Sequence, residues 1–274
     1  MALMRAPWFR WPGVADFMLS KALFSWIAFP VYVWQGISVR LRIERLHPAE
    51  VPHEGRFDGA GDEIRLLVAG DSSVAGVGMA RLDETLAFNI ARALSERTGR
   101  PVRWRAAGAN SATSADLRDH VIPHVESRDF THVVLAVGTN DMKNFHVVGR
   151  FKRHFGTLLY TVRTRFPGAR VVWSPVADMT RIPALPQALG RILQSRAELI
   201  NAMGARLCTE RGAVMAEPVP IEGAHEFARD GFHAGPAGYR NWAEHLASYL
   251  VGPAMPANVL NLERGNRDEQ HKTG

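Results

Sequence analysis

The chain has 274 residues, 46% of them hydrophobic, so it can bury one sizeable core or at most two small ones. Its single cysteine, Cys208, excludes an internal disulfide, and no Cys/His spacing resembles a zinc site. Cys208 falls in a predicted helix, where a buried, unreactive thiol is expected. The formal charge of +6 is compatible with nucleic acid or an anionic membrane as partner, but the basic residues are scattered and no nucleic-acid-binding motif is present.

Residues 22–39 form an uncharged apolar segment that just reaches the length of about 18 residues needed to span a bilayer. Trp26, Tyr32 and Trp34 suit a membrane interface, and Pro30 predicts a kink. Basic residues flank the segment on both sides: Arg5, Arg10 and Lys21 before it, and Arg40, Arg42 and Arg45 after it. No cleavage site follows, which favours a retained membrane anchor over a removed signal peptide, with a packed soluble helix as the alternative. The second basic cluster and the lack of disulfides favour a cytoplasmic catalytic domain.

Residues 47–62 are polar and rich in Gly and Pro, which predicts a linker. Beyond it, short Val- and Leu-rich runs predict strands at 65–69, 102–107, 132–137, 170–176 and 213–216. Between and after them, helical spacing predicts helices at 85–98, 115–126, 147–166, 187–211 and 236–250. This alternation predicts a parallel sheet with helices on both faces. We therefore divide the chain into an apolar segment with linker (1–61), a catalytic domain (62–252) and a polar, disordered tail (253–274).

Polar motifs follow three of the predicted strands, and a fourth precedes the last helix. The sequences are "GDS" at 70–72, "AAGANSATSADL" at 106–117, "VGTND" at 137–141 and "DGFHAGPAGY" at 230–239. Reactive groups in open parallel sheets gather at the carboxyl ends of strands. We therefore expect these motifs to meet at one edge of the sheet.

A serine hydroxyl becomes a nucleophile when a base removes its proton, and His233 can be that base for Ser72. Asp230 lies three residues before His233 on one predicted turn, so its carboxylate can orient the imidazole. The oxyanion of a tetrahedral intermediate needs donors, which the Ser72 backbone N–H and the Asn140 amide can supply. Ser73 is the rival nucleophile, and Asn140 could instead be a turn residue.

The four motifs, in this order, resemble the blocks of the SGNH (GDSL-type) hydrolase family over residues 63–251. The resemblance implies an α/β fold, namely a three-layer α/β/α sandwich with a flavodoxin-like five-stranded parallel sheet. It also implies hydrolysis of a small-molecule acyl ester or thioester without a metal or a cofactor. By resemblance the site comprises the nucleophile Ser72, the base His233, its orienting Asp230, the oxyanion donors Ser72 and Asn140, and Asp71 and Asp141 in support.

The sequence departs from the family pattern at the third oxyanion donor, which is usually a glycine N–H shortly before a threonine. Spacing assigns this place to Ser111, whereas residue identity assigns it to Gly108. A serine N–H can donate equally well where its backbone angles tolerate a Cβ atom. Both residues stay candidates.

The apolar N-terminus favours lipid-like esters or thioesters as substrates, and carbohydrate O-acetyl esters are the alternative. Two other classes of protein compete with a hydrolase: a nucleotide-binding module, and a membrane-anchored scaffold that lacks activity. The stretch "GVGMAR" lacks the last glycine of a dinucleotide fingerprint, and the presence of all three triad residues argues against an inactive scaffold. No nucleic-acid partner is expected.

Overall fold

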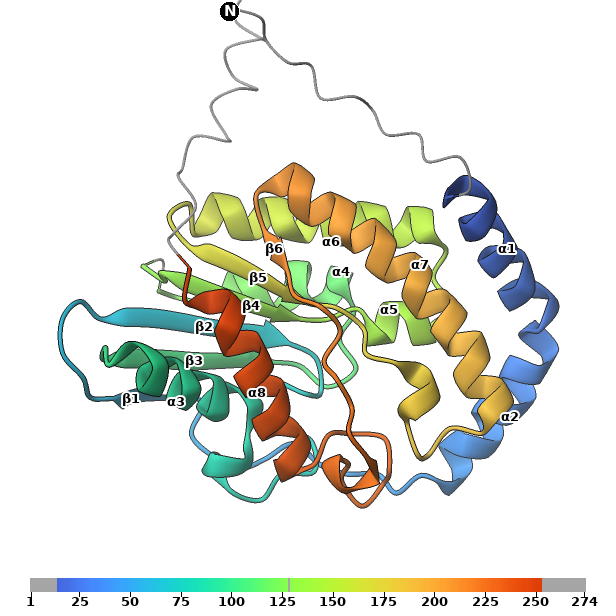
Figure 1. Ribbon diagram of the computed structural model, residues 1–274, viewed down its shortest axis with the longest axis horizontal. Helices are drawn as coiled ribbons and strands as arrows, with labels where there is room; N and C mark the ends of the chain where they lie inside the picture. The colour runs from blue at the N-terminus through green and yellow to red at the C-terminus, as the bar shows by residue number, and fades with distance from the viewer. Residues whose placement is uncertain (1–13, 128, 253–274) are drawn as a thin grey trace, which may run out of the picture.

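A six-stranded mixed sheet in the order β1-β3-β2-β4-β5-β6 forms the centre of the computed structural model (Figure 1). The structure describes residues 14–127 and 129–252, so Arg5, Arg10 and the predicted tail lie outside the described residues. The strands are β1 (Glu54–Phe57), β2 (Ile64–Gly70), β3 (Val102–Gly108), β4 (His132–Ala136), β5 (Arg170–Ser174) and β6 (Val214–Met215). All neighbouring strands pair in parallel except β1, which runs antiparallel to β3.

The five predicted strands are all present, and their order is that of a flavodoxin-like sheet. Of these five strands, β2 comes first in the chain and lies inside the sheet. The next strand, β3, pairs on one side of β2, and β4, β5 and β6 follow in order on the other side. Gly70 at the end of β2 pairs with Gly108 of β3 and with Ala136 of β4. The carboxyl ends of these three strands therefore meet at the point where the strand order reverses, where open α/β sheets bind ligands. The predicted fold class is confirmed, with one strand more than expected.

That additional strand, β1, lies within the predicted linker. It extends the sheet edge through the pairs Glu54 with Arg105 and Phe57 with Val102. Phe57 reaches back to the Phe88 ring of α3 (Leu86–Thr98), with ring centroids 5.1 Å apart. A four-residue edge strand that is mostly exposed needs few apolar residues, which explains why the sequence pattern did not predict it.

Two layers of helices cover the sheet (Figure 1). The helices α6 (Val148–Arg165) and α7 (Gln187–Arg211) pack on one face, and α3 and α8 (Pro236–Leu250) pack on the other. All four begin and end within one residue of the predicted ranges. Each helix buries an apolar stripe against a sheet that is apolar on both faces, so both layers bury large hydrophobic surfaces.

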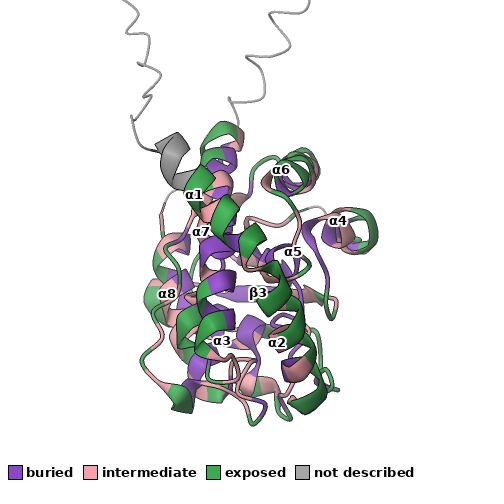
Figure 2. Cartoon of the chain, turned by 90° about the vertical axis from the view of Figure 1, so that its right-hand side faces the viewer, coloured by how far each residue is buried: buried purple, intermediate pink, exposed green. Residues whose placement is uncertain are grey.

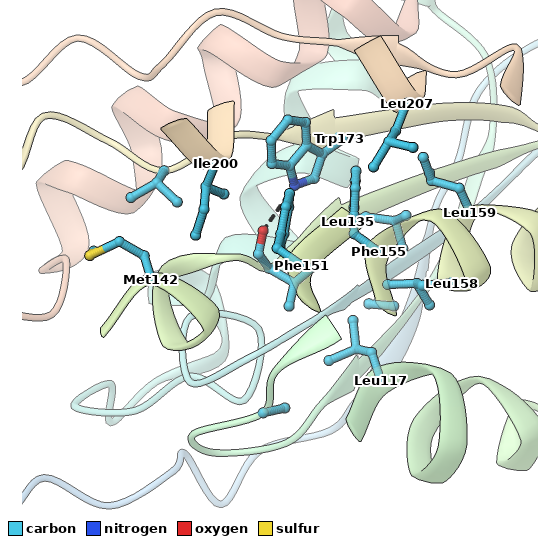
Figure 3. Packing of buried hydrophobic residues seen from close by; sticks show 14 of the residues in the cluster. Leu117, Leu135, Met142, Phe151, Phe155, Leu158, Leu159, Trp173, Ile200 and Leu207 are labelled. Atoms are coloured by element: carbon cyan, nitrogen blue, oxygen red, sulfur yellow. Dashed lines mark hydrogen bonds between the residues drawn. The ribbon is translucent and has the colours of Figure 1, made fainter. Parts of the chain in front are cut away.

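Trp173 of β5 is the largest fully buried side chain in the α6/α7 layer (Figure 3). Its ring packs on Phe155 of α6, with centroids 4.7 Å apart. Its indole N–H donates a 2.9 Å hydrogen bond to the carbonyl oxygen of Val137, immediately after β4. The core therefore restrains the segment that leads from β4 into the "GTND" motif.

The helix predicted at 115–126 is broken into three short pieces. A helical turn, α4 (Ser114–Asp116), continues into a π-helical turn at Leu117–Val121 and a 3₁₀ turn at Ile122–His124. Pro123 lacks an N–H and its ring clashes with the preceding turn, so a regular α-helix cannot continue there. The remaining short elements are α5 (Thr139–Lys143) and 3₁₀ turns at Leu82–Glu84, Met179–Arg181 and Ala224–Glu226.

The apolar N-terminal segment forms two helices, α1 (Val14–Ile27) and α2 (Phe29–Arg42), which lie beside α7 (Figure 1). The axes of residues 19–27 and 29–42 differ by 63°, and Pro30 lies in the first turn of α2, which agrees with the predicted kink. Within the described residues, neither helix is by itself long and apolar enough to cross a bilayer. The bent pair passes that test only by its combined length and composition.

One side of this helix pair is packed on the domain. Lys21 forms a 2.8 Å ion pair with Glu198 of α7, and the buried Ser25 hydroxyl accepts a 3.4 Å hydrogen bond from Arg196. The hydroxyl of Tyr32 donates a hydrogen bond to the backbone carbonyl of Lys143 in α5. Val39 joins the main hydrophobic core.

The segment that follows α2 contacts the loop after β2. The Ala49 N–H donates to the Gly76 carbonyl at 3.1 Å, and the Gly78 N–H donates to the His47 carbonyl at 2.9 Å. Leu46 and Ala49 are buried. Residues 47–62, predicted as a linker, therefore brace the loop that carries Ser72 and extend the sheet, so they are not a free connection between two parts of the chain.

A shortened chain that starts at Asp62 should be destabilised, because it loses β1 and both backbone bonds to the Ser72 loop. We expect its melting temperature to fall by about 10 °C or more relative to the full chain, since a domain of this size loses ~2–4 °C per kcal/mol. A chain that starts at Leu46 keeps these bonds and should melt at a higher temperature than the Asp62 chain. Circular dichroism melts of the three chains test this, and equal stability of the two shortened chains would contradict it.

Candidate active site

Ser72 lies in a tight turn directly after β2. The Asp71 N–H bonds to the Ala136 carbonyl of β4 at 3.1 Å, and the Val74 and Ala75 N–H groups both bond to the Asp71 carbonyl. This turn leaves the Ser72 side chain half-buried at the wall of a pocket. The Ser72 backbone N–H makes no hydrogen bond to any described residue and is available as a donor.

Asp71 and Ser73 hold this turn together. The buried Asp71 carboxylate accepts hydrogen bonds from the Ser73 N–H at 3.1 Å and from its hydroxyl at 2.9 Å. Burial raises the pKa of Asp71, although the Ser73 bonds and the charge of Lys143 oppose that shift. Since the Ser73 hydroxyl is bound to a carboxylate, Ser72 carries the hydroxyl that is free to react, and Asp71 has the bracing position that the sequence predicted.

Asp230 and His233 form a hydrogen-bonded pair on the turn before α8. The His233 Nδ1 atom lies 2.6 Å from Asp230 Oδ2, and the other carboxylate oxygen accepts the N–H groups of Phe232 (2.9 Å) and His233 (3.0 Å). Gly231 occupies the left-handed region with φ of 67°, which lets the chain turn back within three residues. The turn thus pairs Asp230 with His233, and the predicted role of Asp230 in orienting a catalytic base stays a prediction.

The electrostatics of Asp230 suit an ionised carboxylate. Burial by itself raises the pKa of Asp230, but the hydrogen bonds from the His233 side chain and from the two backbone N–H groups outweigh burial, and the net pKa is lowered. At neutral pH the carboxylate is therefore charged and accepts the Nδ1 proton of His233. Nε2 of the imidazole is left to act as a proton acceptor.

The structure brings Ser72 and His233 to the same pocket, but their side chains share no hydrogen bond there. Catalytic hydrogen bonds are often long in unliganded enzymes and shorten when substrate binds. The structure thus places a serine hydroxyl without a hydrogen-bonded partner among the described residues and a histidine bound to a carboxylate at the wall of one pocket.

Asn140 connects three strand ends. It lies on the short helix α5, which begins after Gly138, and its amide nitrogen donates to the Ala112 carbonyl at 3.0 Å and to Asp71 Oδ2 at 3.3 Å. Asn140 is buried and lines the pocket. Both of its amide hydrogens are engaged, so donation to an oxyanion requires the longer bond, the one to Asp71, to be released.

Neither candidate for the third oxyanion donor is among the residues that line the pocket. A Cβ atom on Gly108 would lie 2.2 Å from the Ala75 nitrogen, so this glycine lets the Ser72 turn approach β3. Ser111 is exposed, with φ of 63° in the left-handed region. The variant Ser111→Pro removes the backbone N–H, but a proline, whose φ is near −65°, cannot take that conformation. Activity lost in this variant would therefore reflect backbone strain as well as the missing N–H.

Asp141 lies behind Asn140 and outside the pocket lining. Its fully buried carboxylate accepts the N–H (2.9 Å) and hydroxyl (3.0 Å) of Ser114, and its other oxygen lies 3.4 Å from His146 Nδ1. Burial raises its pKa. Asp141 therefore ties α5 to α4 and supports the position of Asn140.

The pocket opens to solvent, and much of its wall is apolar. The lining side chains that the sequence analysis did not single out include Lys143, Phe232, Tyr239 and Trp242. Phe232 and Tyr239 lie in the same motif as His233, and Lys143 follows the "GTND" motif. Their closeness to the motifs was the only signal in the sequence, because the pocket wall is assembled from loops distant along the chain.

Two other groups bear on the chemistry. Burial raises the pKa of Cys208 to about 12, which agrees with the predicted unreactive thiol. Among the described residues, Glu222, His225 and Glu226 place ligand atoms within 4.8 Å of one another. Both Glu226 carboxylate oxygens already accept hydrogen bonds, one from Asn241 (2.7 Å) and one from the Glu222 N–H (3.0 Å), so this group has a structural explanation.

Comparison with known proteins identifies the family of this chain. The family model described as GDSL-like Lipase/Acylhydrolase matches residues 68–241. A GDSL-like esterase of Mycobacterium tuberculosis is 29% identical over 169 residues, which is 61% of this chain and 51% of that protein. The present chain thus spans about half the length of this relative.

Solved structures share the fold at low identity. TesA has a TM-score of 0.56 and 19% identity, covering 68% of this chain and 98% of its own. An extracellular lipase from Streptomyces rimosus has a TM-score of 0.52 and 15% identity, covering 68% and 99%. An acetylxylan esterase from Geobacillus stearothermophilus has a TM-score of 0.53 and 13% identity, covering 70% and 95%. These likenesses show the fold, and the family match covers most of the domain; the chain belongs to the GDSL-like lipase/acylhydrolase family of ester-hydrolysing enzymes.

Proposed function

We propose that this protein hydrolyses carboxylic esters with Ser72 as nucleophile, His233 as general base and Asp230 as the residue that orients His233. The observation that carries the proposal is the 2.6 Å contact between Asp230 and His233 beside a pocket that Ser72 also lines. An ionised carboxylate that accepts the Nδ1 proton leaves Nε2 free for the proton of the serine.

The reaction follows from these positions. When His233 Nε2 takes the hydroxyl proton, Ser72 Oγ attacks the ester carbonyl and a tetrahedral intermediate forms. Collapse of the intermediate breaks the C–O bond, and protonated His233 returns the proton to the departing alkoxide. A water molecule, deprotonated in turn by His233, then releases the acid from the acyl-enzyme. Asp230 stabilises the charge on His233 during both steps.

The oxyanion would be stabilised by the Ser72 N–H and by the Asn140 amide. The former has no hydrogen-bond partner among the described residues. The latter lies at the pocket wall and would donate to the oxyanion once its 3.3 Å bond to Asp71 is released. Donors held in position before the reaction stabilise the transition state more than solvent does. Gly108 and Ser111, the two candidates for a third donor, receive no role in this proposal, because neither lines the pocket.

For the substrate we propose lipid-like acyl esters or thioesters. The pocket wall is lined by apolar side chains that include Met179, Ile182, Ile221 and Phe227. An apolar wall favours binding of an acyl chain. A chain-length series of 4-nitrophenyl esters, run beside acyl-coenzyme A and acetylated sugars, separates this class from carbohydrate O-acetyl esters: activity that rises with chain length supports the proposal, and preference for acetylated sugars opposes it.

We further propose that α1 and α2 bind a membrane surface. The outer side of the helix pair is exposed (Figure 2), and many of its exposed residues are large and apolar. Its exposed large side chains are Leu19, Leu23, Phe24, Trp26, Ile27, Phe29, Val31, Val33, Trp34, Ile37 and Leu41. Three exposed arginines, Arg40, Arg42 and Arg45, lie at the end of α2 and match the charge of anionic lipid. The cytoplasmic location of the catalytic domain stays a prediction.

To test the nucleophile, Ser72→Ala should abolish labelling by a fluorophosphonate, whereas Ser73→Ala should keep most of it. Loss of a triad residue costs about 10⁴–10⁶ in kcat. Mass spectrometry of the adduct identifies the labelled residue. Label on Ser73 would overturn the assignment, and a folded protein that takes no label would favour the inactive scaffold or the nucleotide-binding module.

Asn140→Ala should lower kcat by about 10²–10³ with little change in KM, because one oxyanion donor contributes mainly in the transition state. Steady-state kinetics on a short ester measure both constants. A change confined to KM would instead make Asn140 a substrate-binding or turn residue. A circular dichroism melt checks that loss of its bonds to Asp71 and Ala112 leaves the domain folded.

Membrane binding should depend on the outer side of α2. Trp34→Ser, Ile37→Ser and Leu41→Ser combined should weaken flotation of the full chain with phosphatidylglycerol-containing vesicles about tenfold or more, since each apolar side chain contributes ~1.5–3 kcal/mol when fully buried. Tyr160→Ser, at a 50% exposed residue of α6, is the matched control and should float normally. A full-length chain that stays in the soluble fraction would contradict the proposal. Release by a carbonate wash would indicate a surface contact.

A further inference from the structure

Lys143 places a positive charge in the wall of the pocket. It is the last residue of α5, three residues after Asn140, and its side chain lines the same pocket as Ser72 and His233. It is the one lysine or arginine among the described residues that line this pocket. The family motifs assign it no role.

The ammonium group of Lys143 has no hydrogen bond or ion pair with any described residue. Its contact is with the ring of Phe232, whose centroid lies 5.7 Å from Nζ. Asp71 is the acidic group that acts on Lys143, but its carboxylate is already bound to Ser73 and Asn140. A partly buried ammonium without a hydrogen-bonded counter-ion is costly, and an anion that enters the pocket would offset that cost.

Burial and neighbouring charges act on the ammonium group of Lys143. Burial lowers the pKa of Lys143, the charge of Asp71 opposes that shift, and the charge of Arg40 on α2 adds to it. Arg40 is therefore a second cation close enough to act on the same site.

The backbone of Lys143 is held in place from outside the catalytic domain. Its carbonyl accepts the Tyr32 hydroxyl of α2. Two residues later, the Phe145 ring packs on Tyr32 with centroids 4.6 Å apart and lies under the guanidinium of Arg196 at 3.7 Å. These contacts fix where the lysine side chain enters the pocket, as a selective binding residue requires.

We propose that Lys143 binds an anionic group, a carboxylate or a phosphate, on the ester substrate, so that the enzyme prefers negatively charged esters to neutral esters of the same size. This inference rests on the proposed ester hydrolysis and adds the substrate's charge to it. The alternative role for Lys143 is to support the reacting groups through Asp71. That role would affect charged and neutral esters alike, so the two roles are separable by kinetics.

The experiment compares short, water-soluble ester pairs that differ in charge. Mono-4-nitrophenyl glutarate and 4-nitrophenyl valerate place the difference on the acyl side. Butyrylglycerol 3-phosphate and monobutyrylglycerol place it on the leaving group. The full-length enzyme is assayed as wild type, Lys143→Met, Lys143→Arg and, as matched control, Lys152→Met at an exposed lysine of α6.

We expect wild type to prefer the anionic member of at least one pair. In Lys143→Met, KM for that anionic ester should rise about 10- to 100-fold, the effect of losing a hydrogen bond to a charged group. The neutral ester should change less than about threefold, Lys143→Arg should keep most of the preference, and Lys152→Met should behave as wild type.

The outcomes separate this inference from the proposed function. Equal losses for both members of a pair, or no anionic preference in either pair, would overturn the role of Lys143 while leaving ester hydrolysis intact. A folded wild-type enzyme that hydrolyses none of the four esters would overturn the proposed function and this inference with it.

Discussion

The buried carboxylate of Asp71 is the group on which the candidate site depends, because it joins the loops that follow β2 and β4. Its oxygens accept hydrogen bonds from Ser73 in the first loop and from Asn140 in the second. A buried carboxylate that lost these donors would be strongly unfavourable, so the two loops are held together. As a consequence Ser73 is occupied, the Ser72 hydroxyl is left free, and Asn140 lies at the wall of the pocket.

Two carboxylates near His233 differ because their surroundings differ. Burial dominates at Asp71 and raises its pKa, whereas hydrogen bonds to His233 and the turn backbone dominate at Asp230 and lower its pKa. Asp230 therefore carries the negative charge that a protonated His233 requires. Lys143 adds an opposite charge to the same pocket, where its ammonium lies 5.7 Å from the ring centroid of Phe232 on the Asp230–His233 turn. In our proposals the negative charge serves catalysis and the positive charge serves substrate selection.

The N-terminal helices have two different sides, and this difference links the surface to the pocket. The inner side packs on the domain through Ser25, Tyr32 and Val39, whereas the outer side exposes apolar residues such as Trp34 and Leu41. The Tyr32 bond to the backbone of α5 joins this helix pair to the element that carries Asn140 and Lys143. If α1 and α2 bind a membrane as we propose, the element that carries Asn140 and Lys143 is linked directly to the membrane-binding helices.

The sequence by itself determined the α/β class, the five parallel strands and the Asp-x-x-His pair, because these depend on local apolar periodicity and on residues in one turn. It did not determine β1, whose exposed residues take their conformation from the neighbouring edge of β3. Nor could it choose between Gly108 and Ser111, because the distance of a backbone N–H from the pocket depends on how loops pack. The position of Lys143 also depends on the tertiary structure, which brings α5, the Phe232 turn and α2 together. Contacts among segments that are distant along the chain leave no periodic signal in the sequence.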